Sequence, residues 1–336
     1  MIRRVKQKAF NLVSRSVGTC DINESIIVFG SPRSGTTWLA EMLKGLPGYK
    51  LLNEPLRLST NPRARDAGFE WRTHLPPGTD SPVREEHLRG VLQGHVDLGP
   101  AWHFRSDGLF GKLWEHVSCN SAVVKFCRLG RMLHWVAERF DVRGMVVVIR
   151  HPCAVISSRL QMGENWKGKD EEKKQIPVSC RYGGKIPERI CDEFSHIFEG
   201  VEHWVEHLAI SWALDYYFAF YDHPRGSEDY PWILTSYEQL LLDGEEELER
   251  IVSKLGGEVT DTMLSQIGTA SSFASDSFRM DVRHQLTKWK SKLTDRQVRD
   301  ILEVAEAFQL DFYEEDPAPN RDRLLQFQES AVPPLL

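Results

Sequence analysis

Short runs of apolar and β-branched residues recur along the chain, and segments with apolar residues at helical spacing separate them. A short, continuously apolar run is typical of a strand buried on both faces of a parallel sheet. These runs lie at 26–29, 50–53, 122–126, 144–150 and 232–235. Helical spacing follows at 36–43, 129–140, 193–222, 244–267 and 294–308. The alternation, with no internal repeat or linker, predicts one α/β domain with a mostly parallel central sheet flanked by helices.

The longest helical pattern lies between Glu193 and Asp222. Its apolar positions repeat at helical spacing, which predicts a single long amphipathic helix. We interpret its aromatic stripe as core packing and not as a cofactor site.

Composition limits the partners of this 336-residue chain. Its 41% hydrophobic content is enough for a sizeable core. The 42 basic and 48 acidic residues give a net charge of −6, so no general attraction to nucleic acid is expected. The expected division is a basic N-terminal arm or helix at 1–20, a single domain at 21–315, and a loose C-terminal tail at 316–336.

The N-terminal stretch is strongly basic. It has no apolar core of the length that a signal peptide or spanning helix needs, which predicts a cytoplasmic protein. Apolar residues at 2, 5, 10 and 13 form a rough stripe, so two hypotheses stay open. One is a solvated helix or frayed arm, and the other is an interfacial helix in peripheral contact with anionic lipid. The basic residues are Arg3, Arg4, Lys6, Lys8 and Arg15.

The six cysteines show no C-x-x-C pair and no zinc spacing. No histidine pattern typical of a metal centre occurs either. We therefore expect reduced thiols and no metal site.

The stretch from Gly30 to Thr37 reads GSPRSGTT and lies between an apolar run and a helical pattern. A tight strand-to-helix loop directs backbone N–H groups and the N–H groups of the first helical turn at one point, where an anion binds. The two glycines have the separation of the nucleotide-triphosphate loop G-x-x-x-x-G-K-[ST], but Thr36 stands where the lysine should be. A cation is present inside the loop instead, as Arg33, whose guanidinium offers a fork of donors. The alternative is an ordinary turn with an exposed arginine.

The segment Pro32-Arg33-Ser34-Gly35-Thr36-Thr37-Trp38 resembles the first nucleotide signature of the PAPS-dependent sulfotransferases. In that family the signature holds the 5′-phosphosulfate of 3′-phosphoadenosine-5′-phosphosulfate (PAPS). Arginine at position 33 is similar to the carbohydrate and tyrosylprotein sulfotransferases and to many bacterial members, whereas cytosolic members usually have lysine. The resemblance implies a P-loop-like sulfotransferase fold, PAPS as co-substrate, and binding of its 5′ end by Arg33, Ser34, Gly35, Thr36, Thr37 and Trp38.

The later segment RHPCAVISSRL resembles the second nucleotide signature of the same family. There an arginine and a serine eight residues later bind the 3′-phosphate, and the matching positions hold Arg150 and Ser158. The resemblance also implies a tyrosine near the adenine, matched by Tyr237. It further implies a basic residue in the loop before a tryptophan, for which Arg279 and Arg283 are both candidates.

A carboxylate suited to proton removal follows the second apolar run. Glu54 precedes a proline, which favours extended backbone at a strand end, where doubly wound sheets bind ligands. The carbohydrate and tyrosylprotein members have a glutamate at this interval from the first signature, and there it is regarded as the base. The resemblance implies that Glu54 takes the proton of the acceptor hydroxyl. The bland interpretation is a surface glutamate in a loop.

The residues at the end of the third apolar run also differ from those of the cytosolic members. Those proteins carry a lysine at this strand end and a histidine base two residues later. Here the lysine position holds Lys125 and the histidine position holds Cys127. This difference argues against the cytosolic members and leaves Glu54 as the better candidate for the base. The resemblance implies that Lys125 steadies the sulfuryl oxygens, and Arg128 at its position resembles the carbohydrate branch. Lys125 as an ordinary strand-end lysine stays an alternative.

Taken together, the resemblance implies sulfuryl transfer from PAPS to an acceptor hydroxyl, with a glycan or glycolipid as the favoured acceptor. Two other hypotheses stay open. One is a nucleotide-dependent kinase with a degenerate phosphate loop, and the other is a non-catalytic anion-binding or membrane-associated module. The stretch 56–118 is expected to form loops and short helices over the sheet, where acceptor specificity commonly resides. The stretch 163–189 mixes charged residues with glycine and proline, which predicts a mobile loop, either solvated or acting as a lid over the acceptor.

Overall fold

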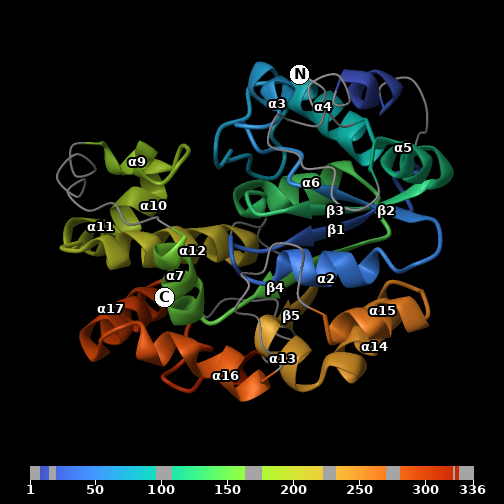
Figure 1. Cartoon of the computed structure of the whole chain (residues 1–336). Coiled ribbons are helices and arrows are strands. Elements are labelled where there is room, and N and C mark those ends of the chain that lie inside the picture. Colours follow the sequence, from blue (N-terminus) through green and yellow to red (C-terminus); the bar gives the residue numbers. More distant parts are fainter. Residues whose placement is uncertain are drawn as a thin grey trace.

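The computed structural model describes residues 8–14, 20–95, 108–162, 176–221, 232–269, 281–320 and 322–324. In this part of the chain, parallel strands form one sheet in the order β2-β3-β1-β4-β5 (Figure 1). The strands are β1 (Ile26–Phe29), β2 (Tyr49–Asn53), β3 (Ser121–Phe126), β4 (Gly144–Ile149) and β5 (Ile233–Ser236). The predicted α/β class with a parallel central sheet is therefore confirmed. The division at residues 20 and 316 stays a prediction.

Side chains of the central strand alternate between two cores. Ile27 and Phe29 point into one hydrophobic cluster, and Ile26 and Val28 point into the other. This is the period-two alternation of a strand, with both faces buried. All four side chains are fully buried.

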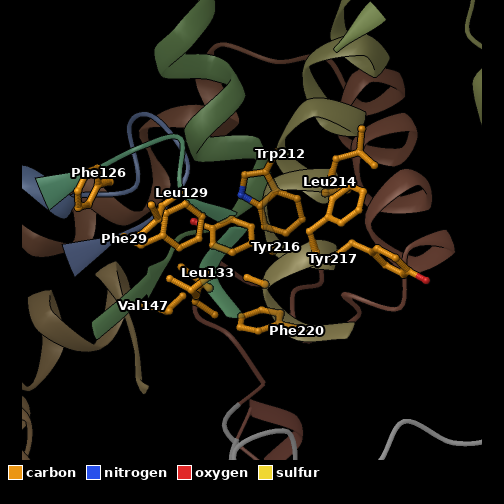
Figure 2. Close-up of a cluster of buried hydrophobic side chains, with 14 of the residues drawn as sticks. Phe29, Phe126, Leu129, Leu133, Val147, Trp212, Leu214, Tyr216, Tyr217 and Phe220 are labelled. Carbon is orange, nitrogen blue, oxygen red and sulfur yellow. The ribbon is translucent and has the colours of Figure 1, made fainter. Parts of the chain in front are cut away.

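Helices cover both faces of the sheet (Figure 1). The face of Ile27 packs against α6 (Leu133–Arg139), α7 (Pro152–Gln161), α12 (Trp204–Tyr221) and α17 (Asp295–Ala307). The opposite face packs against α2 (Thr36–Leu43), α13 (Tyr237–Leu242), α14 (Gly244–Lys254) and α15 (Asp261–Ile267). Figure 2 shows how ring side chains of α12 fill the first core next to β1 and β4.

The prediction of one long amphipathic helix between Glu193 and Asp222 is wrong. The chain instead forms α10 (Glu188–Glu193), α11 (Ser195–Glu199) and α12, and Gly200 ends the second of them. Helix α12 is buried at every position from His207 to Phe220. It lies between the sheet and α17, so it has no solvent face and its polar residues need internal partners.

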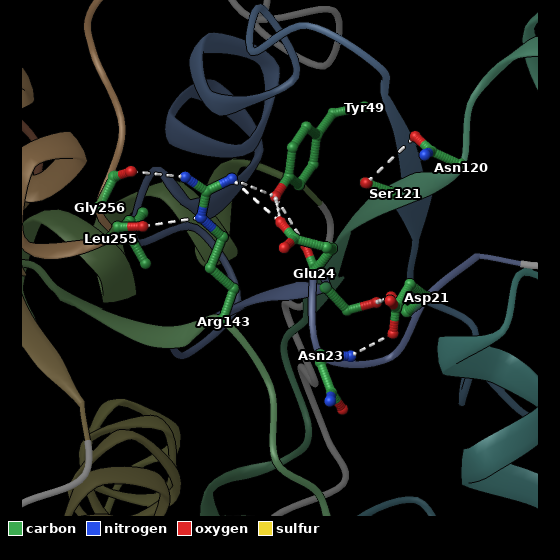
Figure 3. Close-up of polar contacts among 10 residues, drawn as sticks. Asp21, Asn23, Glu24, Tyr49, Asn120, Ser121, Arg143, Leu255 and Gly256 are labelled. Atoms are coloured by element: carbon green, nitrogen blue, oxygen red, sulfur yellow. Dashed lines mark hydrogen bonds and ion pairs between the residues drawn. The ribbon is translucent and has the colours of Figure 1, made fainter.

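A polar cluster joins the amino ends of the strands (Figure 3). Arg143 donates from Nε to the Leu255 carbonyl (2.7 Å), from Nη2 to the Gly256 carbonyl (2.9 Å) and from Nη1 to the Tyr49 hydroxyl (2.8 Å). Tyr49 donates in turn to the Glu24 carbonyl (2.7 Å). The cluster fixes the edge of the sheet opposite to the carboxyl ends of the strands.

The described part of the first insertion forms short helices, as expected, whereas the described part of the second contains a short helix where a loop was predicted. The first contains α3 (Pro62–Asp66), α4 (Pro82–Leu92) and α5 (Gly108–Ser118), and the second contains α9 (Val178–Arg181). Residues 96–107 and 163–175 lie outside the described part. The shorter α16 (Val282–Thr287) precedes α17. Within the described residues, no helix combines the length and apolar character needed to cross a bilayer.

Candidate active site

The loop between β1 and α2 has the backbone of an anion-binding turn. Arg33 and Gly35 have left-handed backbone, with φ of 78° and 88°. Left-handed residues next to right-handed ones turn neighbouring N–H groups to the same side, which makes a concavity for an anion. Gly35 is also the N-cap of α2, so the N–H groups of the first helical turn belong to the same loop. A Cβ at Gly35 would lie 2.4 Å from the Tyr237 ring, so this position requires glycine on two counts.

Side chains of helix α12 form hydrogen bonds with the loop. The Tyr216 hydroxyl donates to the Val148 carbonyl (2.8 Å) and accepts from the Ser31 N–H (3.0 Å). Because its one proton is committed to Val148, Ser34 must donate to it across the 2.9 Å that separate their oxygens. Ser31 Oγ donates to Asp215 (3.0 Å). Two consecutive residues of α12 therefore fix the start of the loop.

Two arginines from different strand ends meet at the loop. Arg33 donates from Nε to Ser158 Oγ (2.9 Å), and Arg150 donates from Nη1 to the main-chain oxygen of Arg33 (2.9 Å). Arg150 is only 6% exposed, and its Nε and Nη2 have no partner in the described part of the chain. Buried polar groups are nearly always paired, so these two N–H groups fit an anionic ligand.

The ring of Tyr237 packs against the guanidinium of Arg150. The guanidinium carbon of Arg150 lies 3.9 Å from the centre of the Tyr237 ring, a cation–π contact. Trp38 lies beside the same ring at 5.8 Å between centroids. Its Nε1 donates to the carbonyls of Gln266 and Thr269, so Trp38 also ties α2 to α15.

Sequence reasoning missed a third cation, Lys288. Burial, together with the positive charges of Arg150 and Arg33, lowers the pKa of Lys288 to about 8. The lysine therefore lies close enough to both arginines to be repelled by them, and a bound anion would offset that repulsion. Of the two earlier candidates, Arg283 occupies an exposed position on α16, and Arg279 lies outside the described residues. The available signal was the position of Lys288 next to the buried Trp289.

Glu54 lies in a second charged cluster, at the ends of β2 and β3. Lys125 Nζ donates to its Oε1 and Arg128 Nη1 to its Oε2, each at 2.8 Å. All three side chains are at most 14% exposed. Burial opposes ionisation, but the two cations prevail and hold the pKa of Glu54 below its usual range. Glu54 is therefore a carboxylate at neutral pH.

Both charged clusters contain a residue with strained backbone. Glu54 has φ of 55°, so Arg33 and Glu54 are two of the three non-glycine residues with positive φ in the described part of the chain. A left-handed backbone costs a non-glycine residue on the order of 1 kcal/mol or more and is concentrated at functional sites. The coincidence supports a functional role for both positions.

Cys127 lies between the two clusters. Its Sγ is 3.7 Å from Thr36 Oγ1, in the first turn of α2, and its thiol also bonds to Glu54. Burial and the neighbouring Glu54 charge raise the pKa of Cys127 to about 11, so the thiol stays protonated at neutral pH. A protonated thiol donates and does not accept a proton, which leaves Glu54 as the basic group of this cluster.

The first insertion contacts the Glu54 cluster, and the second insertion is bonded to the first. The Arg128 guanidinium carbon lies 3.9 Å from the centre of the Trp71 ring, which is 37% exposed. The next residue, Arg72, forms a buried two-pronged ion pair with Asp215 at 2.6 and 3.1 Å. Its N–H donates to the Gly183 carbonyl in the second insertion (2.8 Å). Asp215 thus links the phosphate-type loop to both insertions, which its place within an apolar helix did not reveal.

The structure brings together most of the residues singled out in the sequence. Ser34 and Thr36 are buried, and Thr37 is half-buried on the first turn of α2. The other described candidates surround Arg150 or Glu54 as described above, except for the exposed Arg283. Among the described residues, no group of three or more His, Cys, Asp or Glu side chains could hold a metal ion. The arrangement offers one anion site at the ends of β1 and β4 and one carboxylate with flanking cations at the ends of β2 and β3.

Comparison with known proteins gives distant structural likenesses only. No protein-family model matches the sequence, and no curated protein matches it significantly. The chain is similar to the sulfotransferase domain of the Synechococcus PCC 7002 olefin synthase, with 16% identity, coverage of 89% of this chain and 97% of that one, and a TM-score of 0.45. It is also similar to a mouse sulfotransferase complexed with PAP, with 15% identity, coverage of 89% of this chain and 89% of that one, and a TM-score of 0.40. A third similar structure is a sulfotransferase of Mycobacterium tuberculosis, with 13% identity, coverage of 92% of this chain and 81% of that one, and a TM-score of 0.41. Because these TM-scores lie below 0.5, neither the fold nor the activity of this chain is inferred from them.

Proposed function

We propose that this protein is a sulfotransferase that moves the sulfuryl group of PAPS to an acceptor hydroxyl. One observation carries the proposal: Arg33, Ser158 and Arg150 converge beside the glycine loop. The two segments that resemble the nucleotide signatures are thus neighbours in space, as a single bisphosphorylated nucleotide requires. The unpartnered N–H groups of Arg150 fit a dianionic 3′-phosphate.

In this proposal each cluster has its own part in the reaction. The acceptor oxygen forms a bond to sulfur while the bond between sulfur and the bridging oxygen breaks, and that electron pair leaves with adenosine 3′,5′-bisphosphate (PAP). The loop N–H groups and Arg33 would stabilise the charge that builds on the departing phosphate. Glu54 would accept the proton of the acceptor hydroxyl.

Lys125 has a role of its own in the Glu54 cluster. It is bonded to Glu54 in the structure, and a sulfuryl group placed nearby would compete for the same ammonium. We infer that Lys125 shifts from Glu54 to the sulfuryl oxygens as the donor binds. Loss of one cation would raise the pKa of Glu54 and make it a stronger base when it is needed.

For the acceptor, we propose a carbohydrate hydroxyl, on a glycan or a glycolipid. The support is the pattern of Arg33, Glu54-Pro55, Lys125 and Arg128, which resembles the carbohydrate branch. The half-exposed Trp71 beside Arg128 would form the acceptor side of the site.

The nucleotide is tested first, by thermal unfolding with PAP, with AMP and with ADP plus magnesium. A ligand that binds only the folded protein stabilises it by RT ln(1 + [L]/Kd). We expect PAP to raise the unfolding temperature well above the shift given by AMP, since only PAP has the 3′-phosphate. A shift by ADP with magnesium and none by PAP would favour a kinase and overturn the proposal.

The reaction is tested second, with ³⁵S-labelled PAPS and a panel of glycans, glycolipids, tyrosine peptides and small alcohols. Transfer to a carbohydrate supports both parts of the proposal. Transfer only to a peptide or alcohol keeps the reaction and rejects the acceptor class. PAP binding without transfer to any acceptor would favour a non-catalytic anion-binding module.

A further inference from the structure

Asp215 is a buried acid inside an apolar helix. It is 1% exposed, and α12 lies between the sheet and α17. A carboxylate removed from water is costly unless cations and hydrogen-bond donors surround it. Core packing alone would be served by an apolar residue at this position. The acid therefore has a role that packing does not explain, and the proposed reaction does not use it directly.

The two oxygens of Asp215 join the phosphate-type loop to the first insertion (56–118). Oδ1 accepts from Arg72 Nε (2.6 Å), and Oδ2 accepts from both Arg72 Nη2 (3.1 Å) and Ser31 Oγ (3.0 Å). Ser31 lies at the start of the loop, and Arg72 lies in the insertion. Because one oxygen serves both donors, the carboxylate cannot follow a movement of one donor without changing its bond to the other.

Arg72 continues this contact into the second insertion (163–189). Its N–H donates to the Gly183 carbonyl (2.8 Å), and a Cβ at Gly184 would lie only 1.9 Å from the Arg72 carbonyl oxygen. The two main chains therefore touch with no side chain between them. The buried Arg131 donates to the carbonyls of Tyr182 (2.9 Å) and Gly184 (3.3 Å). The position of the segment 182–184 thus depends on where these two arginines are held.

The same insertion residues reach the Glu54 cluster. Trp71 precedes Arg72, and its ring packs on the guanidinium of Arg128 at 3.9 Å. Arg128 in turn donates to Glu54 at 2.8 Å. Chains of packed side chains and hydrogen bonds are the structures that carry energetic coupling between sites. Such a chain runs here from the loop through Asp215, Arg72 and Trp71 to the proposed base.

We propose that Asp215 is a positioning residue that couples nucleotide binding in the loop to the ordering of the acceptor side, Trp71 and the segment 182–184. This rests on the proposed function, because it takes PAP and PAPS as the ligands of the loop. A nucleotide that prefers the ordered loop favours the state in which Ser31 is bonded to Asp215. Coupling between two sites is reciprocal, so donor and acceptor would bind with positive cooperativity.

The test is hydrogen exchange measured by mass spectrometry, with PAP as the probe, so no acceptor has to be known. Exchange reports the local opening of each segment. We expect saturating PAP to slow exchange in the loop and α2 through direct contact. It should also slow exchange in peptides that cover 70–75 and 182–186, through Asp215. The slowing at these insertion peptides should be about fivefold or more, the lower end of usual coupling between sites.

Ser31→Ala breaks the chain of contacts at its first link. It removes the hydroxyl but keeps the ion pair of Asp215 with Arg72, so no buried charge loses its partner. The Ser31 N–H can still donate to Tyr216, so the loop should still bind PAP. We expect PAP to slow exchange in the loop and α2 of this variant and not in the insertion peptides. Asp215→Asn should show the same loss, and Ser31→Ala provides the test if Asp215→Asn does not fold.

Ser25→Ala is the matched control. Ser25 and Ser31 are both 0% exposed and lie at opposite ends of β1. Ser25 Oγ donates to the carbonyls of Asp21 (3.2 Å) and Leu92 (3.3 Å), away from the loop. This variant should keep the PAP-induced slowing in the insertion peptides. If Ser25→Ala lost that slowing too, the effect would belong to any buried serine and the inference would be overturned.

The remaining outcomes separate this inference from the proposed function. PAP that slows exchange in the loop of the parent but not in the insertion peptides overturns the inference alone. So does slowing in the insertion peptides that persists in Ser31→Ala. PAP that changes exchange nowhere in the parent overturns the proposed function and the inference with it.

Discussion

Arg150 donates a hydrogen bond from Nη1 to the main-chain oxygen of Arg33 across 2.9 Å. The arginine that follows β4 thus supports the strained backbone of the arginine in the loop after β1. The side chain of Arg33 reaches back to Ser158 on the helix that follows β4. Both contacts involve Arg33, so a ligand that displaces one of them also affects the other. This couples the two halves of the proposed nucleotide site.

Arg150→Ala should lower the affinity for PAP about 10- to 100-fold and should change the affinity for AMP much less. The reason is that hydrogen bonds to a charged group contribute about 1.5–3 kcal/mol, and AMP lacks the phosphate that the free N–H groups of Arg150 would bind. Isothermal titration calorimetry with both nucleotides measures the difference. Arg150→Lys keeps the charge, and its affinity for PAP should lie between those of the parent and of Arg150→Ala.

Arg143→Ala is the matched control for this arginine. Arg143 also bonds main-chain carbonyls, but at the amino ends of the strands (Figure 3). We expect a lower unfolding temperature and an unchanged PAP affinity. Equal loss of PAP affinity in both variants would mean that Arg150 acts only by holding the fold.

Glu54→Gln should leave PAP binding nearly intact and reduce turnover about 10²- to 10⁴-fold, the range for loss of a general base. The amide keeps the shape of the carboxylate but cannot take a proton. Turnover with labelled PAPS and the PAP-induced shift in unfolding temperature separate the two effects. Unchanged turnover would remove Glu54 from the base role.

Another buried glutamate in an ion pair supplies the control for this charge loss. Glu247 pairs with Arg250 and accepts from Thr235 at 2.6 Å, at the edge strand β5. Glu247→Gln should lower stability by a similar mechanism and leave turnover unchanged. The comparison separates loss of a buried charge from loss of the reacting group.

The strands and the loop could be predicted from the sequence because local residues determine them. The apolar runs 26–29 and 122–126 need both faces covered, and the glycines and hydroxyls that follow the first run set the loop backbone. The caps of two helices also depend on local residues: Ser236 with Gln239, and Thr294 with Gln297, form the capping boxes of α13 and α17.

The contacts that hold the site could not be predicted, because they join residues far apart in the chain. Tyr216 is an ordinary core aromatic by spacing, yet its hydroxyl bonds to the loop 185 residues earlier. Lys288 is a candidate only because the fold brings its charge near those of Arg33 and Arg150. The charge balance of Glu54 likewise depends on the pairing of β2 with β3.

Tyr216→Phe should destabilise the fold and weaken PAP binding together. The change leaves the Ser31 N–H, the Ser34 hydroxyl and the Val148 carbonyl without their partner, and each buried unpaired group costs about 1–3 kcal/mol. Denaturant unfolding and calorimetry measure the two losses.

Tyr221→Phe removes a hydroxyl from the same helix as a control. That hydroxyl donates to the Gln309 carbonyl (2.8 Å), away from the loop. Its loss should cost stability and spare PAP affinity. If Tyr216→Phe bound PAP like the parent, α12 would not position the loop.

Lys288 should make PAP binding depend on pH. With its pKa lowered to about 8 by burial and by the two arginines, Lys288 is protonated in the free protein below that pH and neutral above it. A bound anion favours the charged form and raises the pKa, so above pH 8 binding must take up a proton. We therefore expect full affinity for PAP below about pH 8 and a fall of up to about tenfold per pH unit above it. The phosphates do not titrate in this range, because their second pKa is about 6.

Lys288→Arg isolates the cause of this pH dependence, since the guanidinium stays charged throughout the range. This variant should bind PAP with an affinity that no longer changes between pH 7 and pH 9, whereas Lys288→Gln should bind weakly at both. Proton uptake, measured by calorimetry in buffers of different ionisation enthalpy, should occur only in the parent. An unchanged pH dependence in Lys288→Arg would assign the titration to another group and would leave Lys288 outside the proposed nucleotide site.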